Sequence, residues 1–144
     1  YVFGMIETMV QNKESYLIEG VHFNTDFSQR LLEKFEDNIR LLYIGYKDIS
    51  IEDKVNELNI YKETMNNPWI FDHQGESVEN IVEYLISESN RIFKECSARR
   101  LDYIDVYDIN EQKDSIIDKL KKFFTISDML KFLSYLNKNV IISY

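Results

Sequence analysis

The sequence contains few of the residues that break or cross-link a chain: one cysteine, one proline and four glycines among 144 residues. A single cysteine, Cys96, excludes an internal disulfide and a cysteine-based zinc site, and it fits a reducing compartment. No apolar run approaches the roughly 18 residues that a membrane span needs. We therefore expect a cytoplasmic protein with no membrane partner, in which Cys96 is a small buried hydrophobe.

Basic residues are also in the minority. The chain has 25 acidic and 17 basic residues, which gives a formal net charge of −8. A phosphate backbone would meet a repulsive field unless a local basic patch overcame it. The one basic cluster, Lys119, Lys121 and Lys122, has the spacing of a solvated helix face. We expect no nucleic-acid partner.

Three motifs that carry well-known chemistry are absent. There is no Gly-x-Ser-x-Gly sequence for acyl transfer, no glycine-rich dinucleotide fingerprint and no Gly-x-x-x-x-Gly-Lys-Ser/Thr phosphate loop. The four glycines, at positions 4, 20, 45 and 75, lie too far apart to form one loop. The absence of a phosphate loop limits any proposal of nucleotide chemistry.

What the sequence does contain is material for one packed domain over residues 1–144, with 44% hydrophobic and 14% aromatic residues. Apolar periodicity predicts helices that alternate with short apolar runs typical of strands, and therefore an α/β fold with a parallel sheet. Ser50 and Asp53 have the spacing of a helix-capping pair. The predicted helices are 2–10, 27–35, 51–65, 78–96, 116–124 and 125–136, and the predicted strands are 16–21, 39–46, 101–107 and 140–144.

Polar residues gather where the predicted strands end, and ligands bind at that edge of a parallel sheet. Glu19, Gly20 and His22 follow the first strand, 46–48 the second and 105–108 the third. A carboxylate there orients a metal-bound water or accepts a proton from a substrate, although Glu19 could equally cap the next helix. His22 is suited to hydrogen-bond a substrate phosphate or hydroxyl, or to play a structural role.

The segment 66–76 holds the only tryptophan and the only proline, between two predicted helices. It is either a loop pinned by an aromatic side chain or a lid that closes over a ligand and excludes water. Its chemistry-bearing residues are Trp69, Asp72 and His73. Arg91, on the following helix, is a candidate cationic contact for phosphate.

The stretches SYLIEGVHF, IRLLYIGY, NNPWIFDHQG and LDYIDVYDI occur in an order that resembles small P-loop kinases of the nucleoside monophosphate kinase-like superfamily, including 2-phosphoglycerate kinase-like proteins, over roughly residues 1 to 122. The resemblance implies a three-layer αβα domain with strand order 2-3-1-4-5. It also implies a transferase that uses ATP and Mg²⁺ to phosphorylate a small-molecule acceptor. The site residues that it implies are Glu19 and His22 for catalysis, Glu19 also near the metal, Trp69, Asp72, His73 and Arg91 for the substrate or lid, and Asp105 and Asp108 near the nucleotide.

The missing phosphate loop is where the sequence departs from these kinases, since positioning the phosphoryl group is nearly all of their catalysis. The chain as written is therefore expected to be inactive as a kinase. The implied strand order also leaves a slot between 16–21 and 39–46. We expect a segment upstream of Tyr1 to fill it, or the C-terminal VIISY, from the same chain or from a second copy in a homodimer. The alternative function is a non-catalytic α/β domain for nucleotide binding or protein interaction.

Overall fold

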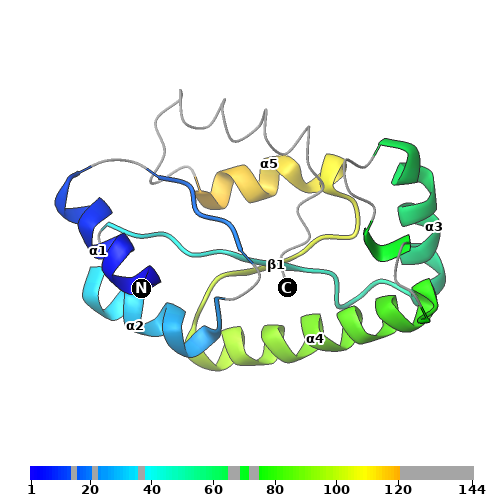
Figure 1. Ribbon diagram of the computed structural model, residues 1–144, viewed down its shortest axis with the longest axis horizontal. Coiled ribbons are helices and arrows are strands. Elements are labelled where there is room, and N and C mark those ends of the chain that lie inside the picture. Colours follow the sequence, from blue (N-terminus) through cyan, green and yellow to red (C-terminus); the bar gives the residue numbers. More distant parts are fainter. Residues whose placement is uncertain (14–15, 21–22, 36–37, 65–68, 72–74, 121–144) are drawn as a thin grey trace.

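A computed structural model describes residues 1–13, 16–20, 23–35, 38–64, 69–71 and 75–120 (Figure 1). Helices dominate these ranges, and two short strands lie among them. The elements in chain order are α1 (Val2–Gln11), α2 (Thr25–Phe35), β1 (Tyr43–Gly45), α3 (Ile51–Tyr61), the 3-10 turns η1 (Lys62–Thr64) and η2 (Trp69–Phe71), α4 (Val78–Arg99), β2 (Tyr103–Asp105) and α5 (Ile109–Leu120).

The two strands form a parallel pair in which Tyr43 lies opposite Tyr103 and Gly45 opposite Asp105. Helices α3 and α4 lie in the connection between them, as a parallel pair requires. Figure 1 shows the pair running between α4 on one side and α5 on the other. The predicted α/β character and the predicted parallel pairing are therefore confirmed.

Helix ends follow the local signals in the sequence. The Ser50 hydroxyl accepts a hydrogen bond from the Asp53 backbone amide at 3.0 Å and donates one to the Asp53 carboxylate at 2.6 Å, which confirms the predicted cap of α3. Ser77 caps α4 in the same way, through the amide of Asn80. Helix α4 ends where Arg100 takes a left-handed conformation with φ of 58°.

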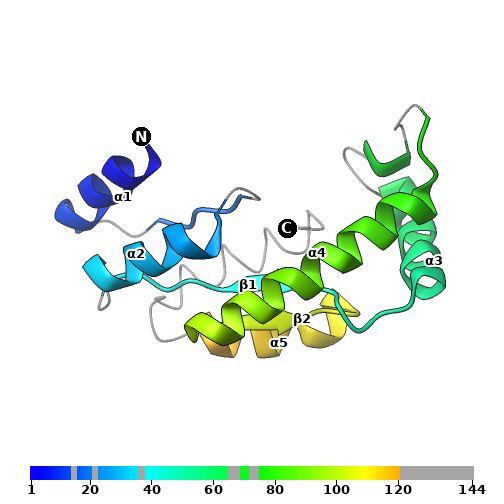
Figure 2. The same ribbon diagram turned by 90° about the horizontal axis from the view of Figure 1, so that it is seen from below.

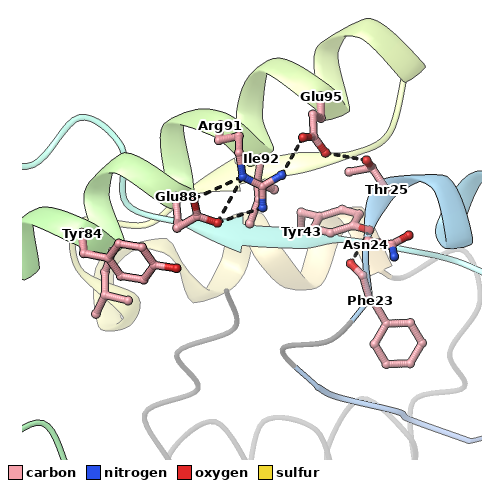
Figure 3. Close-up of a pocket in the computed structure, with 10 residues that line it drawn as sticks. Phe23, Asn24, Thr25, Tyr43, Tyr84, Glu88, Arg91, Ile92 and Glu95 are labelled. Atoms are coloured by element: carbon pink, nitrogen blue, oxygen red, sulfur yellow. Dashed lines mark hydrogen bonds and ion pairs between the residues drawn. The ribbon is translucent and has the colours of Figure 1, made fainter. Parts of the chain in front are cut away.

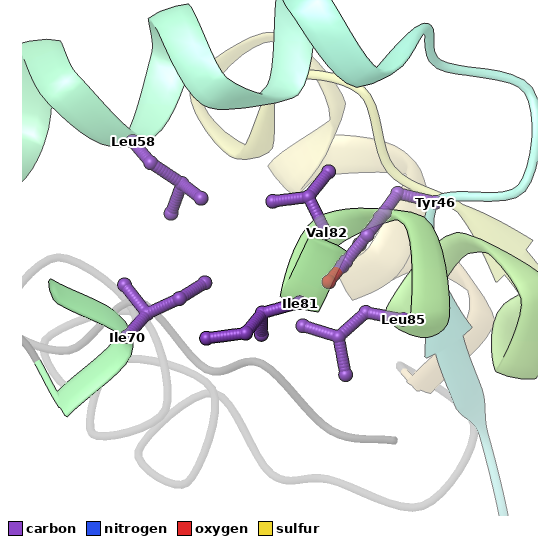
Figure 4. Close-up of a cluster of buried hydrophobic side chains, with 6 residues drawn as sticks. All are labelled: Tyr46, Leu58, Ile70, Ile81, Val82 and Leu85. Atoms are coloured by element: carbon purple, nitrogen blue, oxygen red, sulfur yellow. The ribbon is translucent and has the colours of Figure 1, made fainter. Parts of the chain in front are cut away.

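Among the buried apolar side chains of the described residues, two clusters lie at the ends of the sheet region. Cluster A joins α3, η2 and the first part of α4, and Tyr46 lies beside Val82 and Leu85 of α4 (Figure 4). Cluster B joins α1 to α2. Cys96 is fully buried, as expected, and burial raises the pKa of its thiol to about 11. The buried members are Tyr46, Leu58, Ile70, Ile81, Val82 and Leu85 in cluster A, and Ile6, Leu31 and Phe35 in cluster B.

Helix α4 connects these parts. It contacts α2, α3, η2 and both strands, and Figure 2 shows it crossing the strand pair between α2 and α3. The Ser89 hydroxyl on α4 accepts a hydrogen bond from the Tyr46 amide at 3.3 Å, so the end of β1 is held against the helix. The position of α4 on the sheet fixes which of its side chains face α2.

The predicted first strand is wrong within the described residues, because Tyr16–Gly20 form no strand. Tyr16, Leu17 and Ile18 are 50%, 47% and 38% exposed, whereas a strand covered on both faces would bury them. The other two predicted strands shrink to the residues that pair, Tyr43–Gly45 and Tyr103–Asp105. The predicted strand 140–144 and helix 125–136 lie outside the described residues. No helix in the described ranges is both long and apolar enough to cross a membrane.

Candidate functional site

A cavity of about 400 Å³ lies between α4 and the segment that leads into α2. Three aromatic side chains line it: Phe23 ahead of α2, Tyr43 on β1 and Tyr84 on α4. In Figure 3, Phe23 and Tyr84 lie at opposite ends of the group, with the charged residues of α4 between them. The remaining lining residues are Asn24, Thr25, Leu85, Glu88, Arg91, Ile92 and Glu95.

Arg91 occupies the middle of the cavity wall and is paired with two carboxylates of its own helix. Its Nε lies 3.1 and 3.2 Å from the two Glu88 oxygens, one terminal nitrogen lies 2.8 Å from Glu88, and the other lies 2.6 Å from Glu95 (Figure 3). The hydrogen bonds that Arg91 donates to Glu88, and then those that it donates to Glu95, raise the pKa of its guanidinium further. The guanidinium is therefore permanently charged, and its charge is more than balanced by its neighbours.

Thr25 links this ion network to α2. Its hydroxyl donates a hydrogen bond of 2.6 Å to the Glu95 carboxylate, and the residue is only 3% exposed. This hydrogen bond is the main cause of the lowered pKa of Glu95, and Arg91 lowers it further. A second link between the same elements is the ion pair of Arg99 with Asp26. The two sides of the cavity are thus held together by polar contacts.

Replacement of Thr25 by valine is expected to lower the free energy of unfolding by about 1 kcal/mol at pH 7, because one hydrogen bond to a charged group is lost. The pKa of Glu95 in the folded protein lies below its ordinary value of 4.5, so the carboxylate contributes stability above about pH 4.5. That contribution is lost as the pH falls through the folded-state pKa. The difference between the variant and the parent protein should therefore shrink in urea melts at progressively lower pH.

Thr8→Val is the matched control, because Thr8 is exposed on α1 and its hydroxyl donates to the Gly4 carbonyl of the same helix. Its effect should be small and the same at every pH. An equal loss of stability for Thr25→Val at pH 7 and at pH 3 would show that Glu95 is not the relevant partner.

Tyr43 forms the floor of the cavity. Its hydroxyl donates to the Phe23 carbonyl at 2.8 Å, so the Ser28 hydroxyl, 2.6 Å away, is the donor in their shared hydrogen bond. Burial is the largest cause of the raised pKa of Tyr43. This phenol is therefore a neutral structural group that fixes the segment ahead of α2 on the sheet.

The carboxyl ends of the two strands do come together, as predicted for 46–48 and Asp105. The Asp105 carboxylate accepts hydrogen bonds from the Lys47 amide at 2.6 Å, the Asp48 amide at 3.2 Å and the Tyr103 hydroxyl at 3.2 Å. Its oxygens thus hold the turn after β1. The Asp108 carboxylate accepts from the Glu111 amide at 3.3 Å, at the start of α5.

Apart from Arg91, the predicted site residues that the structure describes do not line the cavity. Glu19 is exposed and does not line it. His22, Asp72 and His73 lie outside the described residues. Trp69 begins η2, and its neighbour Ile70 is buried in cluster A, which gives this short stretch a packing role. Of the predicted residues that fall in the described ranges, Arg91 alone lines the cavity.

A metal site was predicted at Glu19. Across the part of the chain that the structure describes, no group of three or more histidine, cysteine, aspartate or glutamate side chains could hold a metal ion. The cavity carboxylates Glu88 and Glu95 are both engaged by Arg91.

Sequence reasoning missed Thr25, Tyr43, Tyr84, Glu88 and Glu95. The glutamates had a readable signal, because they lie three residues before and four residues after Arg91, on the same face of a helix. Thr25 and Tyr43 had no such signal in the sequence, since their contacts join distant parts of the chain.

Comparisons of this chain with protein-family models, with curated proteins and with solved structures gave no match. The kinase resemblance therefore depends on the sequence pattern alone, and it remains a prediction.

Proposed function

We propose that this chain is a non-catalytic α/β domain that binds a small molecule of the nucleotide class in the cavity between α2 and α4. The observation that carries the proposal is the cavity itself, which combines three aromatic side chains with a fixed set of charged groups. Its volume of about 400 Å³ is within the range of small-molecule sites. Aromatic walls suit a flat heterocyclic base.

Two features favour binding without catalysis. The sequence has no phosphate loop, so the backbone amides and lysine that position a transferred phosphoryl group are absent. Arg91, the cationic residue of the cavity wall, is already paired with Glu88 and Glu95. A guanidinium whose charge is already balanced by two carboxylates adds little stabilisation to the negative charge that develops on a transferred phosphate.

The test is a titration of the protein with each of the four ribonucleoside triphosphates, with and without Mg²⁺, followed by calorimetry and by amide NMR spectra. We expect saturable binding of at least one nucleotide, with the largest shifts at residues that line the cavity, and no release of phosphate above background. A folded protein that binds neither these four nucleotides nor their nucleosides, or that shifts only at residues outside the cavity, would contradict the proposal.

A second candidate, the kinase-like transferase, is favoured by one observation. β1 and β2 are parallel neighbours, and the resemblance expects the same of the fourth and fifth strands in its order 2-3-1-4-5 of a three-layer domain. In this hypothesis Glu19 and His22 act on the phosphoryl acceptor, Glu19 lies near Mg²⁺, and Asp105 and Asp108 lie near the nucleotide. It requires a phosphate loop from elsewhere. Mg²⁺-dependent ATP turnover that Glu19→Gln abolishes would support it.

Cellular location and partners belong to the same proposal. A cytoplasmic location is supported by the single cysteine, which is buried and forms no disulfide. The net charge of −8 supports the absence of a nucleic-acid partner. A homodimer in which VIISY fills the slot of a second copy remains a prediction from the sequence.

A further inference from the structure

We propose that the cavity recognises the uncharged nucleoside end of its ligand, the base and the sugar, and leaves the phosphates outside. This inference rests on the proposed function and specifies which part of the ligand the site reads. Three properties of the cavity support it, and each comes from a different set of contacts.

The first property is charge. Among the described residues, the charged members of the lining are Glu88, Arg91 and Glu95, so the carboxylates outnumber the guanidinium and this part of the wall is net negative. An entering phosphate would have to displace a carboxylate from Arg91 or lie beside one. Like charges at such distances repel, and the overall charge of −8 adds to the repulsion. A neutral nucleoside avoids this cost.

The second property is that the carboxylates in the cavity wall are hydrogen-bond acceptors. Ionised carboxylates only accept hydrogen bonds, and each oxygen can accept more than one. The Glu95 oxygen bonded to Thr25 and the Glu88 oxygens bonded to Arg91 thus retain acceptor capacity. Ribose hydroxyls and exocyclic amino groups of bases are donors that match it, whereas phosphate oxygens are acceptors that do not. The polar groups of the cavity fit the nucleoside end.

The third property is the aromatic lining. Tyr84 is 62% exposed on α4, so its ring contributes little to the core and remains open to a ligand. Phe23 lines the other end of the cavity, ahead of α2, and its ring also packs on Phe27 at 5.7 Å. Stacking of a base on an aromatic side chain contributes about 1–3 kcal/mol and needs no charge on the ligand.

The experiment compares the four ribonucleosides, their triphosphates and inorganic triphosphate as ligands of the intact chain, by calorimetry and amide NMR. We expect one nucleoside to bind at least as tightly as its triphosphate, with shifts at residues of the cavity, and inorganic triphosphate not to compete. A triphosphate that binds tenfold more tightly than its nucleoside and is displaced by inorganic triphosphate would overturn this inference but leave the proposed function standing. Absence of binding by all of these ligands would overturn both.

A matched pair of variants tests the aromatic contact. Tyr84→Ala should weaken nucleoside binding about tenfold, as the loss of one stacking partner requires. Tyr107→Ala is the control, because Tyr107 is also an exposed tyrosine, at 54%, but does not line the cavity. Both variants should melt close to the parent protein. Equal binding by the parent and Tyr84→Ala would overturn the inference.

Discussion

Replacement of Leu31 by alanine should lower the free energy of unfolding by about 3 kcal/mol, the middle of the range for fully buried leucines. Leu31, on α2, has no exposed surface and belongs to cluster B together with Ile6 of α1 and Phe35 of α2. Truncation removes apolar contacts and leaves a cavity that the surrounding rings cannot fill. Urea denaturation should show a lower midpoint with an unchanged slope, because the folded state remains compact.

The matched control is Leu17→Ala, at a leucine that is 47% exposed and belongs to neither cluster A nor cluster B. Its effect should stay within about 0.5 kcal/mol, as is usual for surface positions. Similar losses for the two variants would mean that α1 does not pack on α2 in solution.

Gly45→Ala should destabilise the protein by about 2 kcal/mol, because the new methyl group has no room. A Cβ at this position would lie 2.3 Å from the Tyr103 hydroxyl and 3.0 Å from the Ser89 hydroxyl. Tyr103 cannot easily move aside, since its ring packs on Phe93 at 5.3 Å and its hydroxyl donates to Asp105. Thermal and urea melts of the purified variant measure the loss.

Gly4→Ala serves as the control, because Gly4 lies in the helix α1 and an added Cβ would meet nothing within 4 Å. It should raise the stability by about 0.5–1 kcal/mol, since alanine is the better helix former. In a double variant, Tyr103→Phe should recover part of the loss caused by Gly45→Ala, because it removes the closest clashing atom. A Gly45→Ala protein as stable as its parent would show that Tyr103 does not lie over Gly45.

Helices were the most predictable part of this fold. Their apolar faces recur over several turns, and Ser50 with Asp53 marks a start by its own chemistry. Strands were less predictable, since a short apolar run has no period that separates a buried strand from an exposed segment. This is why the sequence predicts a strand over 16–21, whereas Tyr16, Leu17 and Ile18 are exposed to solvent in the structure. Which of the predicted strands formed depended on pairing with another strand, and local sequence does not encode that pairing.

The site was predictable only where its contacts are local. Glu88, Arg91 and Glu95 have the three- and four-residue spacing of ion pairs on one helix, and that signal can be read directly. The hydrogen bond of Thr25 with Glu95 depends on how α2 meets α4, which no local pattern specifies. The sequence placed Asp105 correctly at the end of a strand and predicted that it lies near a nucleotide. In the structure, its carboxylate accepts hydrogen bonds from the backbone amides of Lys47 and Asp48.

The pairing of Tyr43 with Tyr103 joins positions on either side of the whole α3 to α4 region, so the native sheet closes a long loop of chain. Chain entropy is lost before any hydrogen bond between the strands can form, and such distant pairings slow folding. The contacts of α3 with α4 span far shorter stretches of chain. We expect this helical pair to assemble first on the folding pathway and to serve as the template on which the two strands finally meet.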